Sequence, residues 1–172
     1  GLPCNDLDIE VYGIDLATVH ESLGWSADEC GKQFGILKYG NLDISVPRKD
    51  SQVGRGHKGF LVEFDPSMTP KEAARRRDFT INSMAYDPET DQVLDFFGGQ
   101  QDLREKKLRV TDPITFRDDP LRVLRGMQFC GRFHLVPDLD TTLLCQDMWH
   151  EYCELTKERV WMEFWKWATK ST

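Results

Sequence analysis

Two aspartates close to the start of the chain have the spacing of a metal site. Asp6 and Asp8 lie in the segment Asp6–Tyr12, where polar and apolar residues alternate and predict a strand. Residues two apart on a strand share a face, with Cα atoms about 6 to 7 Å apart. The two carboxylates could therefore bind one or two Mg²⁺ ions for in-line phosphoryl or nucleotidyl transfer. A solvated strand edge produces the same spacing and is the alternative interpretation.

Asp43 is a candidate third carboxylate. Two strands are predicted over residues 34–39 and 42–46, and the Gly40-Asn41 pair between them is typical of a hairpin turn. Asp43 lies on the face of the second strand that is opposite to its apolar residues, where it could join the metal site. A solvated edge residue is an equal alternative.

A block of cations runs into an apolar segment in the middle of the chain. Arg75-Arg76-Arg77-Asp78 is followed by Phe79-Thr80-Ile81-Asn82, which places phosphate-binding charge beside polar groups that can hold a sugar. The structural alternative is the basic end of a short helix over residues 71–77, with Asp78 as the N-cap of the next helix.

A second constellation lies on a helix predicted over residues 118–133. Asp119, Arg122, Arg125 and Phe129 are three or four residues apart and share one side of that helix. A carboxylate beside a guanidinium can accept from the exocyclic amine of cytosine or adenine and donate to the adjacent ring nitrogen. Such a pair could select C and A without a template. A salt-bridge ladder on a solvated face is the alternative.

The remaining elements are expected to position these groups. The sequence predicts a helix over residues 15–23, a basic loop over 47–59, a strand over 92–97 and a charged connector over 102–109. Further helices are predicted over 139–152 and 156–168, the last with an aromatic stripe that includes Trp161 and Trp165. A mixed α/β part is thus expected to give way to helices near residue 113.

Composition narrows the classes of protein. The 172 residues are 40% hydrophobic and carry a formal net charge of −7, which argues against a surface built for nonspecific nucleic-acid binding. The sequence contains no run of eighteen apolar residues, so no membrane span is predicted. The five cysteines form no C-x-x-C pair and predict reduced thiols in a cytoplasmic protein.

Four blocks, taken in order, resemble the class II tRNA nucleotidyltransferase and bacterial poly(A) polymerase family. They are Asp6-Leu7-Asp8, the segment from Lys58-Gly59-Phe60 to Arg76-Arg77-Asp78-Phe79-Thr80-Ile81-Asn82, the run Asp119-Pro120-Leu121-Arg122-Val123-Leu124-Arg125, and Leu155-Thr156-Lys157-Glu158-Arg159-Val160. Together the blocks cover nearly the whole chain, and four of them in order are far more specific than any one alone.

The resemblance implies an α+β fold in two parts. A polymerase-β-like nucleotidyltransferase head, with a small mixed or antiparallel sheet flanked by helices, is expected over residues 1–113. An all-helical neck is expected over residues 114–172. The family's glycine-rich segment before the paired aspartates has no counterpart in the sequence, so the head is expected to be truncated at its N-terminus.

The resemblance also implies a role for each site residue and a set of ligands. Mg²⁺ would be held by Asp6 and Asp8, and the nucleotide's ribose and phosphates by Arg77, Asp78 and Asn82. The base would be read by Asp119 and Arg122, with Arg125 supporting the nucleotide. Glu158 and Arg159 match the neck motif, where a structural role is expected. Asp118 stands where the family usually has Glu, a shorter reach that bears on the pocket's supporting salt bridges.

The implied activity is template-independent addition of C and A to the 3′ ends of tRNA from CTP and ATP. One alternative is a poly(A) polymerase that uses ATP only, in which two basic residues tend to precede a phenylalanine; Lys32-Gln33-Phe34 departs from that pattern. Another is a nucleotide-binding or RNA-binding module without turnover. The oligomeric state is not predicted.

Overall fold

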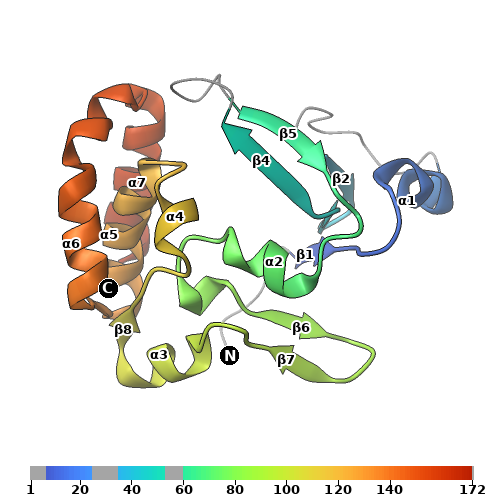
Figure 1. Ribbon diagram of the computed structural model, residues 1–172, viewed down its shortest axis with the longest axis horizontal. Helices are drawn as coiled ribbons and strands as arrows, with labels where there is room; N and C mark the ends of the chain where they lie inside the picture. Colours follow the sequence, from blue (N-terminus) through green and yellow to red (C-terminus); the bar gives the residue numbers. More distant parts are fainter. Residues whose placement is uncertain (1–6, 25–34, 53–59, 172) are drawn as a thin grey trace. The chain divides into compact units, whose positions relative to one another are not determined.

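The structure is a computed structural model, and it describes residues 7–24, 35–52 and 60–171 (Figure 1). Contacts within the chain divide it into an N-terminal unit, Gly1–Ala73, and a C-terminal unit, Ala74–Thr172. The predicted division into head and neck near residue 113 is a different boundary, and it stays a prediction.

A small mixed sheet forms the centre of the N-terminal unit. Its strand order is β1-β3-β2, in which β1 and β3 are parallel and β2 and β3 are antiparallel. The three strands are β1 (Leu7–Glu10), β2 (Ile36–Tyr39) and β3 (Leu42–Ser45). Ile44 and Leu37 are buried beneath α1 (Leu16–Leu23), where they pack with Val19. The predicted alternation of apolar and polar residues is therefore confirmed for β3, whereas Leu7, at the start of β1, is 51% exposed.

Capping side chains set where α1 and the next described α-helix, α2 (Pro70–Arg75), begin. The Asp15 carboxylate accepts from the Thr18 backbone N–H at 2.8 Å and caps α1. Thr69 and Glu72 form a reciprocal capping box at the start of α2, whose first residue is a proline.

The predicted basic loop over residues 47–59 is wrong in its first part. Arg48–Gln52 forms strand β4, which pairs antiparallel with β5 (Phe60–Phe64). Alternating charged and polar residues read as a loop in the sequence, but pairing with the apolar partner strand satisfies their backbone groups. Residues 53–59, which include His57 and Lys58, lie outside the described residues.

A second core lies in the C-terminal unit. The core is built on Phe79, Phe116, Leu108 and Met148, each 1% exposed or less. Before the long helices, the chain forms η3 (Thr80–Asn82), β6 (Ala85–Asp87), β7 (Gln92–Leu94), α3 (Gly99–Glu105) and β8 (Lys107–Leu108). The predicted charged connector over residues 102–109 is thus wrong, because α3 and β8 occupy it.

Asp95 explains why a helix forms there. Its carboxylate accepts from the backbone N–H groups of Gly99 at 2.8 Å and Gln100 at 2.9 Å. Although partial burial opposes ionisation, these backbone hydrogen bonds lower the pKa of Asp95. The carboxylate therefore serves the N-terminus of α3 as a cap, and the strand predicted over residues 92–97 ends early, at Leu94.

Helices dominate the rest of the C-terminal unit, where α5, α6 and α7 run alongside one another (Figure 1). The elements are α4 (Pro113–Phe116), α5 (Leu121–Phe133), β9 (Val136–Pro137), α6 (Leu139–Asp147), η4 (Met148–Glu154) and α7 (Lys157–Lys170). The three predicted helices are present, although the helix predicted to Tyr152 changes to a 3₁₀ helix after Asp147. The predicted all-helical part also contains β9, which pairs parallel with β8.

The aromatic stripe of the last helix faces solvent within the described residues. Trp161 is 63% exposed and Trp165 is 55% exposed, and their ring centroids lie 6.3 Å apart. Among the described helices, none combines the length and the hydropathy needed to cross a membrane.

Candidate functional site

Two of the three predicted metal ligands lie on neighbouring strands of the N-terminal unit. Asp8 on β1 and Asp43 on β3 are register partners in the parallel pair, so their Cα atoms are about 4.8 Å apart. Ile9 and Ile44, one position along each strand, contact the core. Both carboxylates therefore project from the opposite face of the sheet, as the alternation predicted. Asp6 lies outside the described residues.

The donors present fit Mg²⁺ in kind. Carboxylate oxygens are the ligands that this hard cation prefers, and Mg²⁺ commonly takes one or two carboxylates and keeps waters for the rest of its shell. Lys38, the cross-strand neighbour of Asp43, donates to its carboxylate at 2.9 Å. Among the described residues, no group of three or more acidic, histidine or cysteine side chains is close enough to form a complete site. A metal at Asp8 and Asp43 would compete with Lys38.

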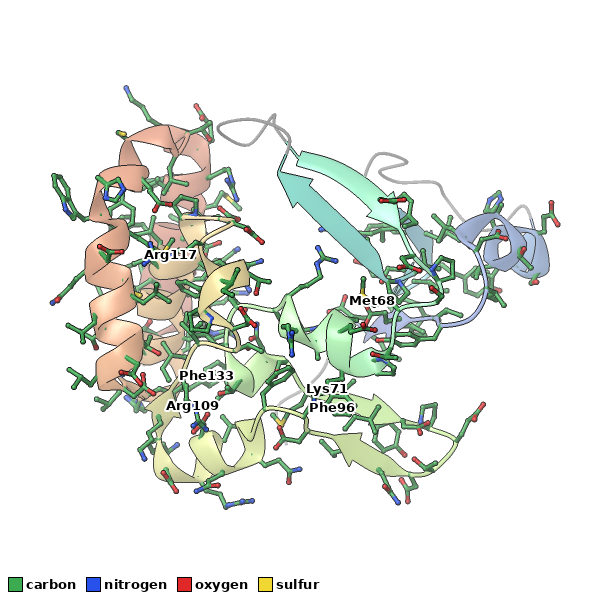
Figure 2. The ribbon with its side chains drawn as sticks, viewed as in Figure 1. Met68, Lys71, Phe96, Arg109, Arg117 and Phe133 are labelled. Atoms are coloured by element: carbon green, nitrogen blue, oxygen red, sulfur yellow. The ribbon has the colours of Figure 1, made fainter. Side chains whose placement is uncertain are left out.

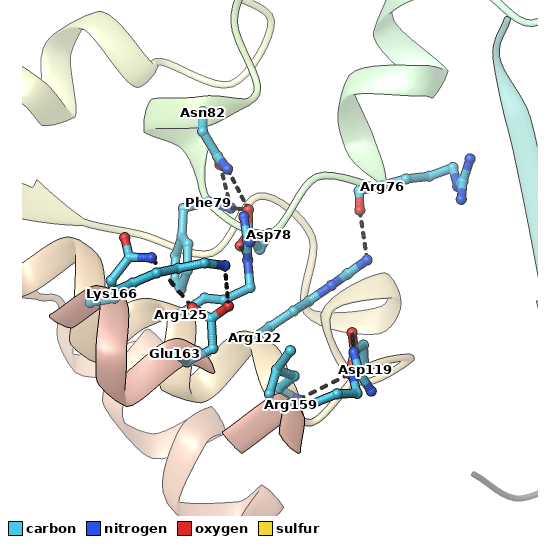
Figure 3. A network of polar contacts seen from close by, with 12 residues as sticks. Arg76, Asp78, Phe79, Asn82, Asp119, Arg122, Arg125, Arg159, Glu163 and Lys166 are labelled. Carbon is cyan, nitrogen blue, oxygen red and sulfur yellow. Dashed lines mark hydrogen bonds and ion pairs between the residues drawn. The ribbon is translucent and has the colours of Figure 1, made fainter. Parts of the chain in front are cut away.

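Asp78 is the centre of a polar network in the C-terminal unit (Figure 3). The side chain is 4% exposed. One carboxylate oxygen accepts from the Asn82 amide at 2.6 Å and the Phe79 backbone N–H at 3.2 Å, and the other accepts from the Arg125 guanidinium at 2.5 Å. Asp78 is not the predicted N-cap of a helix; Phe79 holds that position for η3. The carboxylate instead joins η3 to α5.

Arg125, on α5, forms an ion pair with the buried carboxylate of Asp78. Burial lowers the pKa of this guanidinium, but the charge and hydrogen bond of Asp78 outweigh burial, and the net pKa is raised. Its guanidinium carbon also lies 5.7 Å from the centre of the Phe129 ring, one turn further along the helix. Arg125 is therefore cationic and held in place on two sides.

Arg77 and Asn82 close the turn that carries Asp78. Arg77 donates to the backbone carbonyls of Asn82 at 3.4 Å and Met84 at 3.1 Å. The Asn82 side-chain oxygen accepts from the Phe79 backbone N–H at 3.1 Å. The structure thus brings together Arg77, Asp78, Asn82 and Arg125, four of the six predicted nucleotide-binding residues.

Asp119 and Arg122, the predicted base-reading pair, lie at the start of α5, but each bonds to other groups. Arg122 donates to the backbone carbonyls of Thr115 at 2.5 Å and Arg76 at 2.9 Å. The Asp119 carboxylate accepts from the Leu121 backbone N–H at 3.1 Å and from Arg159 of α7 at 2.7 Å. Their spacing on one side of the helix did not reveal these partners, because none of the partners lies on that helix face.

Sequence reasoning missed an ion pair next to η3, in which the carboxylate is buried and the Arg109 guanidinium is partly exposed. Asp102 is 2% exposed and accepts from Arg109 at 2.8 and 3.0 Å and from the Thr80 hydroxyl at 2.5 Å. Figure 2 labels Arg109 at this place, beside α3. In the sequence both residues belong to a run of charges, which is usually a solvated face. The pair fixes Thr80, two residues after Asp78.

An apolar cavity of about 440 Å³ lies in the C-terminal unit, and no predicted site residue lines it. Two of its lining residues are Cys130 and Cys145. Burial raises the pKa of both thiols, that of Cys145 to about 11. At neutral pH they are protonated, and among the described cysteines they are free, together with Cys153.

A family model and sequence relatives match this chain. Residues 8–109 match the model described as the poly A polymerase head domain. The multifunctional CCA protein of Xylella fastidiosa is 36% identical over 170 residues, which are 95% of this chain and 40% of that protein. The chain therefore spans less than half the length of the curated relatives it matches.

Solved structures share the fold. The CCA-adding enzyme of Bacillus stearothermophilus, solved in complex with CTP, matches with a TM-score of 0.80 at 24% identity. The match covers 96% of this chain and 40% of that enzyme. The CCA-adding enzyme of Thermotoga maritima, complexed with tRNA, matches with a TM-score of 0.74 at 28% identity. The match covers 99% of this chain and 40% of that enzyme. The predicted fold class is confirmed. Because the head-domain model matches more than half of this chain's residues, the chain belongs to the class II tRNA nucleotidyltransferase and bacterial poly(A) polymerase family.

Proposed function

We propose that this chain is the head and neck of a template-independent RNA nucleotidyltransferase that adds C and A to tRNA 3′ ends from CTP and ATP. The proposal divides the chain into a catalytic head over residues 1–113 and a neck over residues 114–172. Family membership supports it, as do the CCA proteins and CCA-adding enzymes that the chain resembles, two of them solved with CTP or with tRNA.

One observation carries the proposal: the central and the later sequence blocks meet in space. Arg125 donates to Asp78 at 2.5 Å and Arg122 donates to the Arg76 carbonyl at 2.9 Å, although 47 and 46 residues separate the partners. Cations that would neutralise phosphates therefore adjoin a polar turn that can hold a ribose. If both blocks were solvated charge runs, their side chains would point into solvent and would not meet at the buried carboxylate of Asp78.

In the proposed metal site, Asp6 and Asp8 would hold Mg²⁺, and Asp43 would be a third carboxylate. Mg²⁺ in such sites lowers the pKa of an attacking hydroxyl and stabilises the triphosphate and its leaving group. Asp8 and Asp43 are register partners with side chains on one face of the sheet, which supports shared binding. Binding would also replace the Lys38 contact to Asp43 with a stronger charge.

At the nucleotide end, Asp119 would accept from the exocyclic amine of cytosine or adenine, and Arg122 would donate to the adjacent ring nitrogen. Uracil and guanine present a carbonyl in place of that amine, and a carboxylate cannot donate to it. A carboxylate has about four acceptor sites and a guanidinium has five N–H donors. The protein contacts of both side chains therefore leave capacity for a base.

The test is nucleotide addition to a tRNA that lacks its terminal CCA, by the full-length protein with Mg²⁺. Asp8→Ala should lower addition by at least about a hundredfold, because a metal ligand is lost. Glu21→Gln removes an exposed carboxylate from α1 and should leave the rate unchanged. Addition that survives Asp8→Ala would contradict the metal assignment, and a product of A residues alone would favour the poly(A) polymerase alternative.

A further inference from the structure

The neck helix α7 contacts the predicted base-reading residue directly. The Arg159 guanidinium, in the first turn of α7, donates to one carboxylate oxygen of Asp119 at 2.7 Å (Figure 3). The two residues are 40 positions apart in the chain. Their side chains are 25% and 30% exposed, so the pair lies at a partly open place where a ligand can reach it.

Asp119 is fixed through both of its oxygens. The second oxygen accepts from the Leu121 backbone N–H at 3.1 Å, at the start of α5. A carboxylate bonded at both oxygens cannot rotate about its side-chain torsion without breaking one bond. Of the two bonds, the one to charged Arg159 is shorter and is the stronger kind. The direction in which the free lone pairs of Asp119 point therefore depends on Arg159.

Arg122 is fixed in a comparable way by two backbone carbonyls, so it does not need α7. Asp119 differs from Arg122, because one of the two groups that hold the Asp119 carboxylate is a side chain, that of Arg159, which a substitution can remove. Loss of Arg159 would release the acceptor of the pair and leave the donor in place. Selection between an amine and a carbonyl on the base depends on that acceptor.

We propose that Arg159 is a positioning residue for base selection, which orients the Asp119 carboxylate so that it accepts from the exocyclic amine of an incoming CTP or ATP. The inference rests on the proposed function and extends it to a residue for which only a structural role was expected. Arg159 does not touch the base; it acts through Asp119.

The bland alternative is an ordinary ion pair that ties α7 to α5. Partly exposed ion pairs contribute little to stability, and α5 and α7 have other contacts: Gln128 with Glu163 at 3.4 Å, and the close approach of Gly131 to Trp167. Removing Arg159 should therefore leave the fold intact, which makes an effect on nucleotide selection measurable by itself.

The experiment measures binding of CTP and UTP, with Mg²⁺, to the full chain and three variants. Arg159→Gln keeps much of the side-chain length without the charge. Arg159→Lys keeps the charge but not the planar fork. Lys170→Gln removes an exposed cation from the last turn of the same helix and is the matched control. Thermal unfolding is recorded for each protein.

We expect Arg159→Gln to lower the preference for CTP over UTP by about tenfold, the order of one well-made base contact. The change should come from weaker CTP binding rather than from loss of all binding. Arg159→Lys should recover part of the preference, and Lys170→Gln should equal the wild type. If Arg159→Gln fails to fold, a normal preference in folded Arg159→Lys would count against the proposal.

Contrary outcomes separate the two claims. A wild-type chain that binds CTP selectively, with an Arg159→Gln variant that is equally selective, would overturn the role of Arg159 and leave the proposed function standing. A wild-type chain that binds UTP as tightly as CTP would overturn base reading by Asp119, and this inference with it. Equal loss of preference in Lys170→Gln would show a general effect of charge on α7 and would also overturn the inference.

Discussion

Asp78 is the residue on which the candidate nucleotide site depends most. It is buried, charged and bonded to three partners, one of which is the guanidinium of Arg125. A buried carboxylate of this kind is costly to leave unpaired, and so is the cation that it neutralises. Its role is therefore visible in stability as well as in binding.

We predict that Asp78→Asn lowers the free energy of unfolding by about 1–3 kcal/mol, because Arg125 loses its charged partner. Arg125 is one-third exposed, with 33% of its side chain open to solvent, so water offsets part of the loss. Denaturant unfolding measures the change. Asp140→Asn, at an exposed carboxylate on α6, should stay within about 0.5 kcal/mol of the wild type. An Asp78→Asn variant as stable as this control would contradict the burial argument.

Residue types, spacing and the family resemblance select the candidate site residues, but they do not show which partners those residues contact. Asp78, Arg125 and Asn82 were selected from two separate blocks, and the structure joins them. The Arg159 bond to Asp119 could not be predicted, because it links residues 40 positions apart on two helices whose packing the sequence does not specify. Asp102 was missed because a buried charge and a surface charge look alike in a sequence.

Among the elements, η3 and α3 together shape the turn that carries Asp78. Gly99, the first residue of α3, lies against η3: a Cβ added there would be 2.2 Å from the Thr80 carbonyl oxygen. Backbone atoms cannot move aside as a flexible side chain can. The close approach of the two elements therefore requires glycine at this position.

We predict that Gly99→Ala destabilises the chain by about 1–3 kcal/mol, because α3 must shift away from η3. The usual gain from replacing glycine in a helix, about 1 kcal/mol at an interior position, is too small to offset the clash. Gln100→Ala, at the next and exposed position of α3, is the matched control. Thermal or denaturant unfolding of the pair tests this, and equal stability of the two variants would contradict the packing described here.

Element prediction succeeded where periodicity was strong and failed where charge concealed it. The strands around Asp8 and Asp43 and the helix from Leu121 to Phe133 follow clear alternation or helical spacing. The sequence predicts a loop where β4 lies and a charged connector over the second half of α3, because these residues are mainly charged or polar. Each is stabilised by something outside its own segment: β4 by pairing with β5, and α3 by the Asp95 cap.

For the whole molecule, the family resemblance identified the fold class that periodicity alone could not. Local patterns indicate a mixed α/β part followed by helices, and the order of four blocks indicates a nucleotidyltransferase head and neck; solved relatives share that fold. The contacts within the chain divide it after Ala73 rather than near residue 113. The predicted metal ligands Asp8 and Asp43 and the predicted nucleotide-binding network around Asp78 accordingly belong to different compact units.

The most direct test is calorimetric binding of each of the four nucleoside triphosphates to this chain in the presence of Mg²⁺. If Asp119 and Arg122 read the base, CTP and ATP should bind, and GTP and UTP should bind at least about tenfold more weakly. Equal binding of all four would contradict base reading by these residues, and binding of ATP alone would contradict CCA addition in favour of polyadenylation.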